Sequence, residues 1–554
     1  MLNFNERCSD GSLLTRPVWK VLIYDRLGQD IISPLLTVKQ LRDLGVTLHL
    51  PLHTKRDSIT EAPAVYFILP TDENIQRICQ DIKQQVYGTF YLNFLTAISR
   101  EKLEHIALAV CQSGNTEIIS KVVDQFLNFI AIEDDLFILR EYQSDLISYQ
   151  ALNSSSVSEA EITGIIETIA DSLFSTFVNL GVVPIIRCSP SNAAEMVAES
   201  LDKKIRENLA DMNNNLFVPN FQNFSHLSFN RPLLIILDRH IDLATPLHHT
   251  WTYQALAHDL LGLNLNRIIV PPDTESRLRN PDAEAKTYDL QSTDTFWNTF
   301  KGSPFPTVAE SIQAELDAYK AQEGEVKRLK DAMGLSDTDN PDVVSGAIAS
   351  STAMLTSAIS SLPELMEKKK SIDMHTNIAM TLLDNIKERK LDEYFEIEEK
   401  IMTRSTIDKG VLDIIRNPQA GVELDKLRLL AIQYISSQDM SEADLALYLP
   451  SLQNSIHCSS LFNYLNKWKS ISKLLTGPVA DGLTAGNTAS SVSTMFSKLV
   501  SSGSKLWTEG VKNLVIRDKN LPVTRITDAL MENKSISEIK EYKYFDPKLQ
   551  SSSL

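Results

Sequence analysis

The sequence predicts an α/β protein in which two parallel-sheet α/β units are joined to a mainly helical domain. Over the first 240 residues, short apolar runs alternate with stretches of helical period, the pattern of strands joined by crossover helices. From about residue 304 to 472 the helical period dominates and strand-like runs nearly vanish. At about 150 residues per domain, 554 residues also leave room for three to four domains.

The first unit begins with the apolar run Val18–Tyr24, which is typical of a buried strand. A helical stripe over 30–44 follows and ends at Gly45, a residue that favours helix C-termini. Further strands are expected at 46–50, 64–69 and 89–95, with a helix at 72–86. Strands separated by helices imply a doubly wound, mainly parallel sheet.

Two more helices are expected at 100–111 and 117–130. The first carries Leu103, Ile106 and Ala107 at helical spacing, and the second carries Ile119, Val122, Val123 and Phe126. Both stripes could simply face the sheet. The second covers a wider arc than one core face needs, so an apolar groove that accepts a partner's short helix is the alternative.

The second α/β unit comprises a helix at 159–180, a strand at 182–187, a helix at 192–210 and the apolar strand Pro232–Leu237. The helical block is expected to contain helices near 306–332, 352–370, 372–390, 423–437 and 458–473. Pro363 should start, kink or stop a helix, because it lacks a backbone donor. Residues 343–361 carry no charge, and the Ser-, Thr-, Gly- and Ala-rich segment 476–504 indicates a flexible connection.

Composition excludes several classes of protein. A formal net charge of −17 disfavours sequence-independent binding to nucleic acid. No apolar run is long enough to cross a bilayer, and residues 1–10 do not form a signal peptide. The five cysteines include no CxxC pair, which favours a reducing, cytosolic setting.

Enzyme signatures are absent: the chain has no GxSxG, GxxxxGK[ST], GxGxxG after a strand or HExxH motif. The Asp- and His-rich stretch 237–260 is the strongest chemical signal. A metal-dependent hydrolase using Asp238, Asp242 and His249 is one interpretation. We favour a structural polar corner, in which Asp238, Arg239 and Asp242 hold turns after the strand Pro232–Leu237.

Three blocks of sequence resemble the SM (Sec/Munc-like) family: DRHIDLATPLHHTWTYQALAHDLL (238–261), SLPELMEKKKSIDMHTNIA (361–379) and AEMVAESLDKKIRENL (194–209). Two further blocks, 19–50 and 301–316, resemble its Sly-type branch. The resemblance implies a three-domain arch that binds syntaxins and guides SNARE assembly. The domains implied are 1–135, 136–240 and 241–474 with a lid at 333–361, followed by a linker and a truncated return to the second domain at 475–554.

By this resemblance the protein is not an enzyme and needs no cofactor or metal. It would be a SNARE-assembly chaperone in ER-to-Golgi and intra-Golgi transport. It would be cytoplasmic and bind peripherally to ER and Golgi membranes. Its partners would be a Golgi syntaxin and the SNARE bundle. The syntaxin N-terminal peptide would bind the set Leu103, Ile106, Ala107, Ile119, Val122 and Val123. The SNARE bundle would bind Leu362, Pro363, Lys368, Lys369, Ile372 and His375, with Lys370 completing the basic face.

The resemblance also suggests where the chain departs from the family pattern. After Tyr544–Lys548 the family continues with a further strand and helix, whereas only LQSSSL follows here. We expect the returning chain to lie beside Pro232–Leu237, to leave one strand edge uncovered and to be less stable than a longer form.

Overall fold

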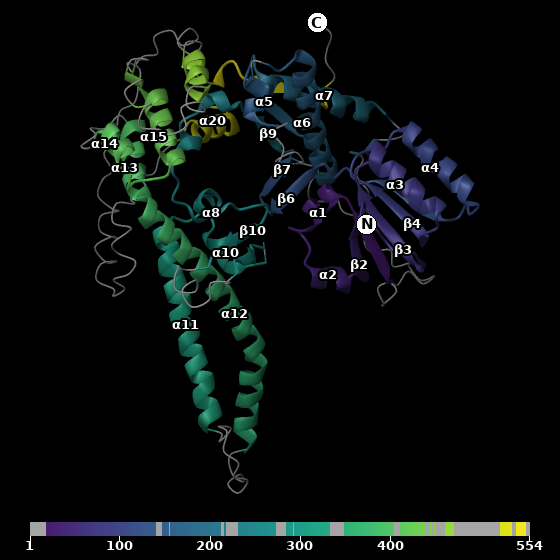
Figure 1. The fold of residues 1–554 in the computed structure, drawn as a ribbon, viewed down its shortest axis with the longest axis horizontal. Coiled ribbons are helices and arrows are strands. Elements are labelled where there is room, and N and C mark those ends of the chain that lie inside the picture. The colour runs from purple at the N-terminus through teal and green to yellow at the C-terminus, as the bar shows by residue number, and fades with distance from the viewer. Residues whose placement is uncertain are drawn as a thin grey trace. The chain divides into compact units, whose positions relative to one another are not determined.

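The computed structural model describes residues 18 to 549, apart from 140–146, 155, 212–214, 218–230, 273–283, 292, 333–347, 404–409, 438–439, 441–443, 446–447, 449–459, 470–520 and 535–538. The chain divides into two compact units (Figure 1). The first consists of Met1–Ile241 and Asn520–Leu554, and the second of Asp242–Lys519. The division into three domains stays a prediction.

The first unit contains a five-stranded sheet in the order β2-β1-β3-β4-β5. The strands are β1 (Lys20–Tyr24), β2 (Val46–Pro51), β3 (Ile59–Ile68), β4 (Tyr87–Phe94) and β5 (Ile119–Asp124). All four neighbouring pairs are parallel. Every residue of β1 is buried, as a central strand with both faces covered requires. The predicted α/β class with a parallel sheet is confirmed.

Short helices connect these strands. They are α1 (Arg26–Ile32), α2 (Val38–Asp43), α3 (Asp72–Lys83) and α4 (Arg100–Ser113). The single helix expected over 30–44 is therefore wrong. α1 ends before Pro34, and α2 begins at Thr37, whose side chain and Gln40 form a reciprocal capping box. Pro34 has no N–H with which to continue the helical hydrogen bonds, so a new start signal is needed beyond it.

The second sheet of this unit has three strands in the order β12-β8-β9, from β8 (Ile185–Cys188), β9 (Leu233–Ile236) and β12 (Lys543–Phe545). The returning chain pairs antiparallel with β8, not beside Pro232–Leu237 as expected. Asp546 accepts two hydrogen bonds from the Arg231 guanidinium, at 2.7 and 2.9 Å, which fixes this position. β9 is thus an edge strand among the described residues, and its Leu233 is 37% exposed.

Two long helices pack together beside this sheet, α6 (Glu159–Leu180) and α7 (Ala193–Ala210). A Ser158–Glu161 capping box begins α6, and Gly181 ends it in the left-handed conformation. A β6–β7 hairpin (Phe129–Glu133, Leu136–Leu139), the short helix α5 (Tyr149–Asn153), the 3₁₀ turn η1 (Arg239–Ile241) and α20 (Pro522–Met531) complete the first unit.

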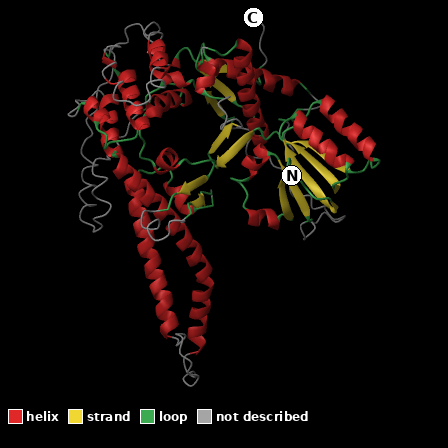
Figure 2. Cartoon of the chain, in the orientation of Figure 1, coloured by secondary structure: helices red, strands yellow, loops and turns green. Residues whose placement is uncertain are grey.

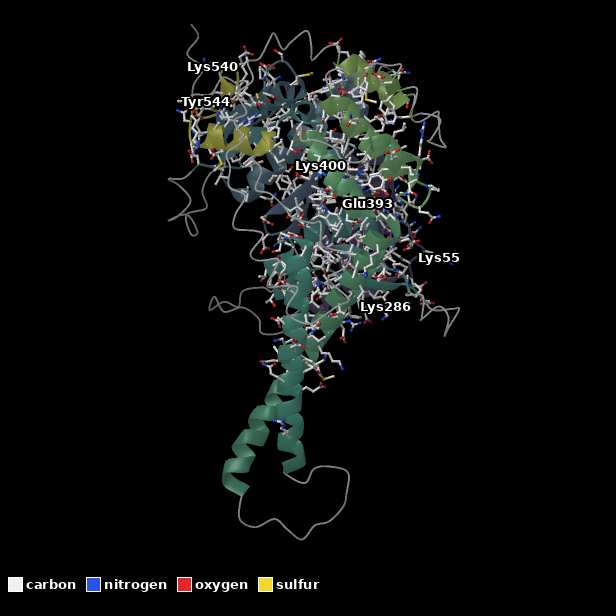
Figure 3. All side chains as sticks on the ribbon, turned by 90° about the vertical axis from the view of Figure 1, so that its left-hand side faces the viewer. Lys55, Lys286, Glu393, Lys400, Lys540 and Tyr544 are labelled. Carbon is white, nitrogen blue, oxygen red and sulfur yellow. The ribbon has the colours of Figure 1, made fainter. Side chains whose placement is uncertain are left out.

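The second unit is mainly helical (Figure 2). It contains the 3₁₀ turn η2 (Thr245–Leu247), α8 (Tyr253–Leu261), α10 (Thr295–Phe300), α11 (Phe305–Ala332), α12 (Ile348–Arg389), α13 (Leu391–Met402), α14 (Val411–Arg416) and α15 (Glu423–Ser436). Residues 460–469 are also helical. Glu393 and Lys400 both lie on α13 (Figure 3), and Lys400 pairs with Glu396 at 2.9 Å.

One feature of this unit differs from expectation. The helices expected at 352–370 and 372–390 form one helix of 42 residues, α12, and Pro363 lies within it. The unit also contains a two-stranded antiparallel sheet, β10 (Arg267–Val270) with β11 (Lys286–Asp289). Residues 333–347 of the expected lid lie outside the described residues, and 348–361 belong to α12.

Asp25 holds the end of the first sheet together. It follows β1 and begins α1, where its Oδ1 accepts a 2.8 Å hydrogen bond from the N–H of Gly28. Its Oδ2 accepts the N–H of Leu69 at 2.8 Å and Nδ2 of Asn74 at 3.1 Å. Burial raises the pKa of Asp25 and these hydrogen bonds lower it; burial is the larger effect, so the pKa is raised overall. One carboxylate therefore fixes α1, the end of β3 and α3.

We expect Asp25→Ala to lower the free energy of unfolding of the first sheet by about 2–3 kcal/mol, because it removes a helix cap and leaves buried donors unpaired. Thr37→Ala removes an exposed cap and should cost about 1 kcal/mol or less. Amide hydrogen exchange of peptides from 18–139 measures both. Equal losses in the two variants would contradict the assigned role of Asp25.

Candidate partner-binding surfaces

The first candidate surface lies on α4. Ser99 caps this helix by accepting the N–H of Lys102, and Gly114 ends it with φ +74°. Ile106 and Ala109 are 3% and 2% exposed and pack on the sheet. Leu103 is 38% exposed and Ala107 is also exposed. Of the three α4 residues predicted to bind a peptide, Leu103 and Ala107 reach the surface, and Ile106 lies in the core beneath them.

Residues 119–124 form the edge strand β5, so the helix expected over 117–130 is wrong. β-Branched residues favour strands, and β5 contains Ile119, Val122 and Val123. β4 and β5 pair with a register shift, because Phe90 is opposite Ile119 whereas Tyr91 is opposite Lys121. This bulge adds one residue to β5 and changes the alternation of its side chains.

The bulge explains why the pattern looked helical. Val122 is opposite Leu92, and Ile119 is opposite Phe90. Leu92 and Phe90 belong to the core that also contains Ile106 of α4. Ile119 and Val122, three positions apart, therefore share the face of the sheet that α4 covers. Val123 is opposite Asn93 and lies on the other face.

We define the α4–β5 surface as Leu103, Ala107, Ile119 and Val122; Val123 lies on the opposite face of β5 and is not brought together with them. Val122 and Val123 are 42% and 39% exposed, and Ile119 is half-buried. No described strand pairs with the free side of β5. The apolar residues at this edge are thus available to a partner. Leu108, at 60% exposed, is a further apolar side chain on α4 that the sequence interpretation did not select.

The second candidate surface lies on the hairpin of α11 and α12. Lys368 Nζ of α12 pairs with Glu315 Oε2 of α11 at 2.9 Å. Lys369 and Lys370 are exposed, and Met366 and Met380 are 72% and 52% exposed. We define the α12 surface as Met366, Lys369, Lys370 and Met380. The side chains of Leu362 and Pro363 lie outside the described residues.

Two residues predicted to touch a SNARE bundle are in the core instead. Ile372 is 7% exposed and His375 is 1% exposed. His375 Nδ1 lies 2.9 Å from the Tyr253 hydroxyl, and its Nε2 lies 3.2 Å from Asp294 Oδ2. Burial raises the pKa of Asp294, but hydrogen bonds from His375, the N–H of Trp297 and Ser371 outweigh burial and lower it. Direct contact of Ile372 and His375 with a partner does not fit their burial.

In the Asp- and His-rich stretch 237–260, Asp238 and Asp242 accept hydrogen bonds from residues two or three positions further along the chain. Asp238 accepts hydrogen bonds from the N–H and Nδ1 of His240, and Asp242 accepts the N–H groups of Ala244 and Thr245 at 3.1 and 2.9 Å. Arg239 is exposed in η1. In the described ranges, no group of three His, Cys, Asp or Glu side chains could hold a metal. No described helix is long and apolar enough to cross a membrane.

His249 lies apart from those aspartates, in a buried ionic network of the second unit. Its Nδ1 is 2.8 Å from Glu398 of α13, and its Nε2 is 3.1 Å from Asp425 of α15. Asp425 also pairs with Arg389 at the end of α12. Since both ring nitrogens face carboxylates, the imidazole donates from both and carries a positive charge. Burial lowers the pKa of His249, but the hydrogen bonds to Asp425 and Glu398 outweigh burial and raise it.

This network makes stability depend on pH. Because the pKa of His249 is raised in the folded state, its stabilisation is complete below the ordinary pKa of about 6.5 and is lost as pH rises through the folded pKa. We expect the thermal midpoint of the second unit to fall as pH rises above about 6.5 and through the raised pKa of His249 in the folded state. His249→Gln should flatten that fall, whereas His258→Gln, at an exposed position on α8, should not. A fall that is unchanged in His249→Gln would contradict the assignment.

The comparisons with known proteins agree over nearly the whole chain. The Sec1 family model matches residues 20–553. The chain is 52% identical to the human protein "Sec1 family domain-containing protein 1" over 99% of this chain and 85% of that protein. It is 48% identical to "Protein sly1 homolog" of Drosophila melanogaster, over 99% of this chain and 85% of that protein.

Solved structures give the same result. The crystal structure of Sly1p in complex with an N-terminal peptide of Sed5p matches with a TM-score of 0.72 and 29% identity, covering 97% of this chain and 81% of that chain. The SM protein Vps45, in complex with the Qa SNARE Tlg2, matches with a TM-score of 0.66 over 96% of this chain and 84% of that chain. At 18% identity, the Vps45 match supports the fold alone.

Proposed function

Because this chain belongs to the Sec1 family, and within it is similar to Sly-type proteins, we propose that it binds a Golgi syntaxin and the SNARE partners of that syntaxin to promote vesicle fusion. The observation that carries the proposal is the match to Sly1p, whose structure holds an N-terminal peptide of Sed5p. The protein would act between ER and Golgi and within the Golgi, on the cytoplasmic side of those membranes, held there by its partners.

The work of such a protein is binding rather than bond chemistry. The α4–β5 surface supports this proposal, because it exposes apolar side chains at the edge of a rigid sheet. Burying one large apolar side chain of a peptide there would contribute about 1.5–3 kcal/mol. That is enough to position a short peptide while leaving the contact reversible. We therefore infer a non-catalytic role.

The binding test is a pull-down with a Golgi syntaxin, with and without the N-terminal peptide of that syntaxin. The proposal predicts capture that weakens when the peptide is removed. If neither form of the syntaxin is captured, the proposed partner is wrong.

The α4–β5 surface can be tested by one substitution. Ala107 is a small, exposed residue of α4, so Ala107→Lys would place a long charged side chain where the peptide must pack. We expect peptide affinity, measured by titration, to fall at least tenfold with an unchanged thermal midpoint. His105→Lys is the matched control, since residue 105 is exposed but points about 200° away around the helix. Equal affinity in Ala107→Lys and the parent chain would exclude this surface.

The α12 surface is tested by charge reversal. We propose that Lys369 and Lys370 steer acidic SNARE helices towards the hairpin, whereas Lys368 is already paired with Glu315. Lys369→Glu together with Lys370→Glu should slow association with the SNARE bundle about fivefold to tenfold at low salt, and less at high salt. Lys387→Glu, exposed near the other end of α12, is the control. A loss of the same size in Lys387→Glu would show that the effect is only one of overall charge.

A further inference from the structure

A cavity of about 560 Å³ lies in the first unit, and no residue of the α4–β5 surface lines it. It opens beyond the carboxyl ends of β4 and β5, where Thr96, Ala97 and Phe126 line it, and its other walls come from α6 and α7. Ligands of open α/β sheets bind outside the carboxyl ends of the strands, in cavities of this size. The position and volume are therefore those of a binding site.

One wall of the cavity is held in an unusual conformation. Phe126 has φ +51°, in the left-handed region that residues other than glycine rarely adopt. Its carbonyl oxygen accepts a hydrogen bond from Nδ2 of Asn179 on α6. Its ring lies 6.4 Å from the ring of Phe174, at an interplanar angle of 70°. Backbone strain of this kind is retained where a side chain must point in a particular direction, here as an aromatic wall.

The buried part of the cavity presents an acceptor. Asn128 is 1% exposed, and its Oδ1 has no hydrogen-bond partner among the described residues. An unpaired buried carbonyl is costly, so a ligand that donates an N–H to it would be stabilised. A donor of an occupant that reaches Asn128 Oδ1 would therefore be favoured.

The remaining charges are mostly negative. Lys204 Nζ lies 2.8 Å from Asp171 Oδ1, so the lysine charge is compensated within the wall. Glu207 and Asp211 line the same cavity and are exposed, and Glu207 also lies 4.0 Å from Lys203 Nζ, which is outside the lining. Three carboxylates and one ammonium give the lining a formal charge of −2. A cationic occupant is therefore favoured over an anionic one.

We propose that this cavity binds the guanidinium group of an arginine in a basic peptide segment of a partner protein. A guanidinium is flat, stacks on aromatic rings and carries five N–H donors, so it can pack against Phe126 and Phe174 and donate to Asn128. The exposed carboxylates of Glu207 and Asp211 would pair with a second basic residue beside that arginine. A segment is thus favoured over a lone arginine. The proposal is independent of the proposed SNARE function.

The probe is N-acetyl-arginyl-lysinamide, titrated calorimetrically into the full chain. N-acetyl-citrullinyl-lysinamide, in which the uncharged isostere citrulline replaces arginine, should bind at least tenfold more weakly. N-acetyl-arginine methylamide, which lacks the second cation, should bind at least threefold more weakly than the dipeptide. Equal binding of the citrulline compound would overturn recognition of a guanidinium, and equal binding of the lone arginine would overturn recognition of a segment.

Substitutions test whether the dipeptide binds in this cavity. Asn128→Leu and Asp211→Asn should each weaken binding of the dipeptide at least fivefold. Asp211 is exposed, so its variant tests the site even if Asn128→Leu does not fold. Glu199→Gln removes the same charge within α7, which Asp211 directly follows, but outside the cavity, and should leave affinity unchanged. Equal losses in Asp211→Asn and Glu199→Gln, or none in Asp211→Asn, would overturn the assignment.

Discussion

A parallel sheet that is buried between helices still has a strand with one unpaired side at each edge. In the first unit, the exposed edge strand β5 is the constraint on which the proposed binding surface depends. β5 pairs with β4 on one side only in the part of the chain that the structure describes. α4 rests on the sheet through Ile106 and Ala109, and Val122 and Val123 of β5 remain exposed. An edge strand with apolar side chains invites pairing or aggregation unless something covers it. Here the uncovered edge is the surface on which the proposed peptide binding rests.

The second unit depends on compensation of buried charge. Glu398 and Asp425 are fully buried, and a buried carboxylate without a counterion is strongly destabilising. His249 lies between them, and Arg389 pairs with Asp425, so the loop before α8, the end of α12, α13 and α15 meet at one set of ionic contacts. The ring of Tyr394 lies 5.6 Å from that of His249, and the charge of Arg428 lowers the pKa of His249. Removing one partner would leave the others buried without compensation.

Much of the fold follows from local signals. α6, α7 and α15 lie within a residue of their predicted bounds. For α6 and α7 the reason is that Ser158, Asn192 and Gly181 are clear start and stop signals and the apolar stripes between them are long. The strand 119–124 was missed because a bulge places Ile119 and Val122 on one face, which imitates helical spacing. The burial of His375 could not be predicted from nearby residues, because its partners Tyr253 of α8 and Asp294 before α10 are distant in sequence.

The uninterrupted course of α12 has a mechanical consequence. Its 42 residues make a rod about 60 Å long, and Pro363 does not divide it. Near its C-terminal end, Ile378, Leu382 and Ile386 are fixed in the core of the second unit. Rotating that anchored end by about 5° would carry the far end of the rod about 5 Å, close to one helical turn. The helix can therefore work as a lever, in which a small repacking at the core displaces the far end of the rod sideways by several ångströms.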